Sequence, residues 1–188
     1  MFKRFTSIFA ALLLGFAFSS AWADEYSDTI SIFKNAGESG GFFGKAYGYA
    51  VFPTVGKGGV GVGGAFGKGR VYEKGKYIGD TSLAQLSVGL QLGGQAYSEI
   101  IFFEDQRALK EFTSGNFGFG ADASAVAITA AAGAKASTTG TSAGISGGKK
   151  DAATAGGYQK GMATFTVAKG GLMYEASING QKFSYKPR

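Results

Sequence analysis

Four basic side chains gather within nine residues of this sequence, around one predicted turn. Two tyrosines lie among them, and one more lysine stands upstream, so the candidate lipid-binding set is Lys57, Lys68, Arg70, Tyr72, Lys74, Lys76 and Tyr77. Clustered cations with amphipathic aromatic rings suit an anionic interface between lipid and water. The residues fit equally well a solvated hairpin whose charges keep a strand edge from aggregating.

Catalytic and metal chemistry find little support in the composition. The chain has no His and no Cys, which removes the usual general base near neutral pH and the commonest ligands of zinc. Two G-x-S-x-G matches, Gly140–Gly144 and Gly144–Gly148, have no His partner. A G-x-G-x-x-G match at Gly59–Gly64 is followed by residues that form helices poorly. We therefore expect a protein that is not an enzyme and that uses no cofactor or metal.

The first 23 residues have the pattern of a secretory signal peptide. Lys3 and Arg4 precede an apolar run, and small residues at Ala21 and Ala23 fit cleavage after Ala23. The apolar run is shorter than the ~20 residues of a membrane-spanning helix. We expect a periplasmic protein, peripheral to a membrane at most, with a signal peptide at 1–23, a helical segment at 24–44 and one domain at 45–188.

Glycine is abundant, with 33 residues in a chain rich in Phe and Tyr. This composition favours twisted strands in which backbones and rings approach closely. The periodicity predicts a mainly β (α+β) fold, an antiparallel β-sandwich or barrel-like sheet with one or two short helices. Residues 24–44 start helical, with Ile30, Phe33 and Ala36 on one face and a stop at Gly37.

Local signals place several strands and turns. The centre Lys74-Gly75 predicts a hairpin. The alternation of Leu86, Val88, Leu90 and Leu92 predicts one buried apolar face, and the run Ile100–Phe103 predicts a strand buried on both faces. Asp105 is expected to cap a short helix that ends near Gly115. Asn179-Gly180 predicts a hairpin with a type I′ turn.

Two glycine- and alanine-rich stretches are harder to interpret. Residues 121–136 are ambiguous between strand and helix. A strand is favoured because Gly120 and Gly133 flank the apolar part of this stretch and because Val126 and Ile128 alternate with a period of two. Residues 138–154 combine Gly, Ser, Thr and Ala, which predicts a loop.

Four sequence blocks resemble the SYLF-domain family. They are AVFPTVGKGGVGVGG at 50–64, SEIIFFEDQRALKEF at 98–112, the Gly/Ala-rich stretch 116–133 and AKGGLMYEASING at 168–180. The resemblance implies binding rather than catalysis, because eukaryotic relatives bind phosphoinositide membranes and some bind actin. In a periplasm, anionic phospholipid headgroups are the natural substitute. The N-terminal segment carries only one basic residue, Lys34, which departs from the amphipathic helix that assists membrane contact in eukaryotic relatives.

Three functions remain in competition. A periplasmic domain that binds anionic phospholipid through the basic hairpin comes first, and no nucleic acid is expected as a partner. A small outer-membrane β-barrel is the first alternative, although the continuous run Ile100–Phe103 and the ending Tyr185–Arg188 depart from that pattern. A periplasmic module that binds an unknown protein is the second.

Overall fold

Seven strands of the described residues form one sheet in the order β5-β6-β4-β1-β2-β3-β7. The computed structural model describes residues 20–60, 62–88, 95–121, 123, 125–128, 157–169 and 178–188. All neighbouring strands are antiparallel except β5 and β6, which run parallel. The strands are β1 (Gly48–Val60), β2 (Val62–Glu73), β3 (Lys76–Val88), β4 (Gln95–Phe103), β5 (Val126–Ile128), β6 (Met162–Lys169) and β7 (Gln181–Pro187).

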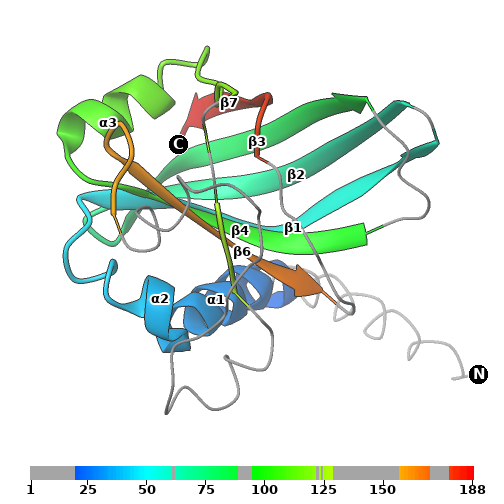
Figure 1. Cartoon of the computed structure of the whole chain (residues 1–188). Helices are drawn as coiled ribbons and strands as arrows, with labels where there is room; N and C mark the ends of the chain where they lie inside the picture. Colours follow the sequence, from blue (N-terminus) through cyan, green and yellow to red (C-terminus); the bar gives the residue numbers. More distant parts are fainter. Residues whose placement is uncertain are drawn as a thin grey trace, which may run out of the picture.

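Helices cover the two sides of the sheet unequally (Figure 1). The N-terminal helices α1 (Ser20–Asn35) and α2 (Gly37–Gly40) lie together, and Phe33 and Ala36 pack with buried residues of β1, β4 and β6. Helix α3 (Gln106–Phe112) lies at the opposite side, where Phe112 packs on Phe103 and Phe183. On β2, β3 and β7, Tyr26 of α1 approaches the sheet at Arg70.

The sheet curls strongly, so that strands far apart in its order meet inside it. Strands β4 and β7 are separated by β1, β2 and β3, yet Gln181 Nε2 of β7 donates to Glu99 Oε2 and to the Tyr97 hydroxyl of β4 at 3.0 and 3.3 Å. The curl encloses a core that includes Phe52, Phe103 and Phe183. The expectation of a mainly β fold is confirmed, and the arrangement is the barrel-like sheet rather than two packed sheets.

The clearest local predictions are confirmed. The side chains of Ile100, Ile101, Phe102 and Phe103 are fully buried, alternately against α1 and against the enclosed core. Asp105 caps α3, because its carboxylate accepts a 2.8 Å hydrogen bond from the Ala108 amide. Gly115 follows the helix with φ +87°.

The two predicted tight turns differ from each other. Lys74 and Gly75 have φ values of 49° and 81°, so both central residues are left-handed as a type I′ hairpin requires. At the second turn Gly180 has φ +76° and Asn179 is not in that region, although Ile178 O accepts from the Gln181 amide. The type I′ prediction at Asn179-Gly180 is thus wrong, and a positive φ at the second central residue alone is typical of type II.

Another expectation needs correction. Leu86 points outward with 75% of its surface exposed, while its neighbour Gln85 is buried, so the predicted apolar face of this strand is reversed at that position.

Two further local expectations agree with the structure. Helix α1 ends at Asn35, close to the stop expected at Gly37, and the short helix α2 then begins at Gly37. Gly59 and Gly64 belong to the paired strands β1 and β2, so the residues after them continue a strand and form no helix, as the sequence predicts.

Several predictions fall outside the described residues. These are most of the signal peptide (1–19), the end of the Leu86 alternation (89–94), the loop 138–154 with both G-x-S-x-G matches, and the strand expected before Asn179 (170–177). Within the ambiguous stretch 121–136, the short strand β5 is the regular element that the structure describes.

Candidate functional site: a basic face of the curled sheet

The register of four strands places the basic side chains in rows on one face of the sheet. Lys68 of β2 lies opposite Ser82 of β3, and Ser82 lies opposite Ser184 of β7. One row nearer the Lys74-Gly75 turn, Arg70 lies opposite Asp80, and Asp80 lies opposite Lys186. Because directly paired residues point to the same side of a sheet, cations from β2 and β7 share the face that adjoins α1.

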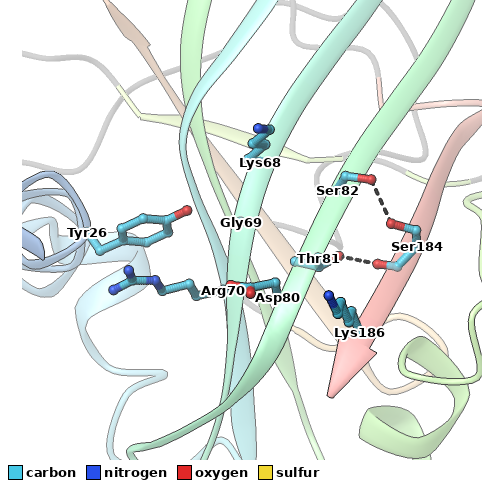
Figure 2. A pocket seen from close by; sticks show the side chains of 9 residues that line it. All are labelled: Tyr26, Lys68, Gly69, Arg70, Asp80, Thr81, Ser82, Ser184 and Lys186. Atoms are coloured by element: carbon cyan, nitrogen blue, oxygen red, sulfur yellow. Dashed lines mark hydrogen bonds between the residues drawn. The ribbon is translucent and has the colours of Figure 1, made fainter. Parts of the chain in front are cut away.

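An open groove of about 410 Å³ runs between this face and the start of α1. Figure 2 shows Lys68, Arg70 and Lys186 around it, with Tyr26 of α1 beside the Arg70 side chain. The floor is polar: the hydroxyl groups of Ser82 and Ser184 lie 2.6 Å apart, and Thr81 donates to the Ser184 carbonyl oxygen at 2.7 Å. Its full lining is Tyr26, Lys68, Gly69, Arg70, Asp80, Thr81, Ser82, Ser184 and Lys186.

Arg70 is held between aromatic rings. Its guanidinium carbon lies 4.1 Å from the centre of the Tyr26 ring and 4.9 Å from that of Tyr77. Burial raises the pKa of Tyr26 above its ordinary value, and the positive charge of Arg70 opposes that rise. A stacked guanidinium of this kind fixes the start of α1 on the sheet as well as adding positive charge to the groove.

The tyrosines of the predicted site serve mainly as packing. Tyr72 stacks on Tyr49 with ring centres 5.0 Å apart and lies 5.8 Å from Tyr77. Burial raises the pKa of Tyr49 to about 12. The Tyr77 hydroxyl donates to Asp80, and burial is the largest cause that raises its pKa. These rings join the hairpin to the strands beside it.

The hairpin turn itself carries two lysines. The Lys74 ammonium lies 5.1 Å from the centre of the Tyr47 ring, and the Tyr47 hydroxyl donates to Glu73 at 2.7 Å. Lys76 is exposed. Both lysines can reach a partner beyond the end of the sheet.

Lys57 does not join the other six predicted residues. It pairs with Ala65, which belongs to the enclosed core, so its side chain starts from the opposite face of the sheet. The irregularity between Val51 and Thr54 shifts the register of β1 and sets this orientation. The closeness of Lys57 to the other basic residues in the sequence did not indicate that it lies on the opposite face.

Beyond anion binding, the described residues show no site for metal chemistry. No group of three or more His, Cys, Asp or Glu side chains lies close enough together among them to hold a metal ion. Within the same residues, no helix has the length and apolarity to cross a membrane. For Lys68, Lys182 and Lys186, no carboxylate of the described residues lies within ion-pair distance. The face can therefore attract phosphates and other anions.

Residues 84–187 match the model of the Ysc84 family, which is described as Las17-binding protein actin regulator. This range is more than half of the chain. The chain belongs to the Ysc84 family. The family is the one that contains the SYLF domain, so the resemblance found in the sequence is confirmed. No curated protein matches the chain.

The Ysc84 match covers only part of the basic face. It includes β4, α3, β5, β6, β7 and the end of β3, while the basic hairpin at 68–77 precedes it. Within the Ysc84 match, β7 supplies two cations that sequence reasoning missed, Lys182 and Lys186. Sequence reasoning also missed Arg188, which follows β7 and whose guanidinium carbon lies 4.9 Å from the Tyr77 ring centre. The alternation of Lys182, Ser184 and Lys186 signals one polar face, but not which strand lies beside it.

Proposed function

We propose that this Ysc84-family protein is exported and binds anionic phospholipid membranes peripherally, through the β2–β3 hairpin together with β7. The observation that carries the proposal is the register of β2, β3 and β7, which sets the basic side chains in rows. It brings Lys68 and Arg70 of β2 beside Lys186 of β7 on one exposed face, with Lys182 one row further along. A SYLF-type domain is associated with lipid binding, which supports a lipid as the partner.

The electrostatics favour attachment at the surface of an anionic bilayer. Each basic residue near such a surface contributes about 1 kcal/mol. Lys68, Lys182 and Lys186 together would then contribute about 3 kcal/mol, which is roughly a hundredfold in affinity. The attraction decays within about 8 Å at physiological ionic strength, so binding of this kind weakens as salt rises.

Two parts of the hairpin have different roles in the proposal. Lys68 borders the open groove, where a headgroup phosphate can also reach the hydroxyl groups of Ser82 and Ser184. Lys74 and Lys76 lie at the turn and add charge at the end of the sheet. Arg70 acts chiefly through Tyr26 and Tyr77, because its guanidinium is already stacked on those rings.

Vesicle co-sedimentation tests the proposal with a matched pair of triple variants. The test variant changes Lys68, Lys182 and Lys186 to Gln. The control changes Lys45, Lys57 and Lys110 to Gln, which removes the same charge from other surfaces. Wild type and control should bind vesicles of phosphatidylglycerol and phosphatidylethanolamine, less in high salt, and ignore phosphatidylcholine. The test variant should lose most binding. Equal losses in both variants would reject this face as the site.

Further variants separate the turn from the groove. Changing Lys74 and Lys76 to Gln should weaken binding less than the triple change, because these side chains lie at one end of the face. If the wild-type protein binds no anionic vesicles, the lipid proposal is wrong and a protein partner is the next one to seek.

The export part of the proposal has its own measurement. Cleavage after Ala23 would give a chain that begins at Asp24 and lacks Trp22, the one tryptophan of the sequence. Intact mass of the protein recovered from the periplasm reads this directly. Tryptophan fluorescence in that protein would contradict cleavage at this position.

A further inference from the structure

Two large apolar side chains project from the basic face into solvent. Phe66 of β2 is 56% exposed and Leu86 of β3 is 75% exposed. Among the described residues the one other large hydrophobic side chain with comparable exposure is Ile32 of α1, at 38%. Scattered single exposed apolar residues are ordinary on a protein surface, whereas two large ones side by side are informative.

The register shows that Phe66 and Leu86 are neighbours. Phe66 pairs with Ala84, and Leu86 pairs with Gly64, so the two side chains lie on the same face at diagonal positions of β2 and β3. Diagonal neighbours of this kind lie within reach of each other across an antiparallel pair. Together they form one apolar ridge that we call the Phe66–Leu86 ridge.

The surroundings of the ridge explain why it stays uncovered. The partners of Phe66 on the two flanking strands are Gly56 and Ala84, and the partner of Leu86 on β2 is Gly64. A side chain added at Gly56 would meet nothing within 4 Å. Neighbours this small cannot shield the large side chains, so Phe66 and Leu86 project beyond the residues around them.

Cations border the ridge. Ala84 pairs with Lys182 of β7, which places Lys182 in the same row as Phe66, and Lys68 lies two residues along β2 on the same face. Both lysines are exposed. An apolar centre with a cationic border matches an anionic bilayer, where the ring and the leucine enter the acyl boundary and the ammonium groups stay among the phosphates.

We propose that the Phe66–Leu86 ridge is the part of this protein that enters the bilayer, with Lys68 and Lys182 at the level of the headgroup phosphates. The inference rests on the proposed function and adds to it the orientation and depth of binding. Protruding apolar side chains with exposed lysines in the same and the next row favour an anionic lipid surface over a protein partner. Burial of apolar surface gives the binding a component that salt does not screen.

Matched single-face variants test the ridge against α1. Phe66→Thr with Leu86→Thr places a β-branched residue that favours strands at both positions, and Ile32→Gln places a good helix former on α1. On vesicles of phosphatidylglycerol and phosphatidylethanolamine at high salt, the ridge variant should bind at least tenfold more weakly than wild type. Ile32→Gln should bind as wild type does. Unchanged unfolding temperatures would show that both variants are folded.

A second measurement locates the ridge in the membrane. In a Trp22→Phe background, Phe66→Trp places the sole tryptophan at the ridge. Its emission should shift to the blue on anionic vesicles and be quenched by lipids brominated near the headgroup end of the chain. Emission that neither shifts nor is quenched while the protein is bound would overturn the proposal.

The outcomes distinguish insertion of the ridge into the bilayer from the proposed lipid binding on which this inference rests. If the ridge variant binds as wild type does while the lysine triple variant loses binding, the ridge proposal is wrong and lipid attachment is purely electrostatic. If Ile32→Gln loses binding and the ridge variant does not, α1 enters the bilayer instead. If the wild-type protein ignores anionic vesicles, both proposals fail together.

Discussion

Gln181 donates a 3.0 Å hydrogen bond from Nε2 to Glu99 Oε2, across the inside of the curled sheet. Both side chains are fully buried, and Glu99 Oε1 has no hydrogen-bond partner among the described residues. Removal from water disfavours the charged form of the carboxyl group more than the Gln181 amide favours it. Burial therefore raises the pKa of Glu99 to about 8.

The first prediction concerns the pH dependence of stability. In the unfolded chain Glu99 ionises near its ordinary pKa of 4.5, while in the folded protein it holds its proton up to about pH 8. The folded state then binds more protons between these values, so its stability is greatest below about pH 4.5 for this group and falls as pH rises toward 8. Thermal unfolding measured across that window should show the fall.

The variant Glu99→Gln supplies the control for this effect. It carries no titrating proton at position 99, so its unfolding temperature should vary less between about pH 5 and pH 8 than that of wild type. An identical pH profile in the two proteins would mean that Glu99 is ionised in the fold.

The second prediction compares two glycines on neighbouring strands. A Cβ atom at Gly69 would lie 2.6 Å from the ring of Phe52, which is fully buried, and 2.8 Å from the Val51 carbonyl oxygen. Gly69→Ala should lower the free energy of unfolding by about 1–3 kcal/mol, as overpacking does. At Gly58 a Cβ atom meets nothing within 4 Å, so Gly58→Ala is the matched control. Urea denaturation of both variants checks the difference, and equal stabilities would disprove the close approach.

The third prediction concerns the cap of α3. Asp105→Ala removes the carboxylate that accepts from the Ala108 amide and should lower the free energy of unfolding by about 1 kcal/mol. Asp105→Asn should retain most of the stability, because its side-chain oxygen can still accept. Glu104→Ala changes an exposed neighbour that does not cap and serves as the control. A loss as large in Glu104→Ala would assign the effect to charge rather than to capping.

The fourth prediction concerns the turn before β7. Gly180 has φ +76°, and a Cβ atom there would meet nothing within 4 Å, so only the backbone conformation opposes a side chain. Gly180→Val should lower the free energy of unfolding by about 1–2 kcal/mol. Gly180→Asn should lose less, because Asn adopts this conformation more readily. Thermal unfolding that leaves Gly180→Val unchanged would contradict the turn geometry.

Short-range signals in the sequence were sufficient for several elements of the fold. The Asp105 cap, the Lys74-Gly75 turn and the buried run Ile100–Phe103 each depend on residues within one element, and each is confirmed. The basic residues of β2 were also identified, because Lys68 and Arg70 are close in sequence. Family resemblance added the association with lipid binding, which local patterns could not supply.

Features that depend on long-range pairing could not be predicted. Lys186 lies on the same face as Arg70 only because β7 pairs with β3, and Lys57 leaves that face because the register of β1 shifts. The exposure of Leu86 follows from which side of β3 the enclosed core occupies, and alternation alone does not specify that side. For the same reason the interior meeting of Glu99 and Gln181 had no sequence signal.

The pairing of β7 with β3 also fixes when the protein can finish folding. Ser82 and Ser184 form a hydrogen bond at a sequence separation of 102, so the loop that closes this edge is long and its entropy opposes early formation. Strand β7 carries both Phe183 of the enclosed core and the amide partner of Glu99. The enclosed core and the hydrogen bond to Glu99 are therefore complete only after β7 has paired with β3.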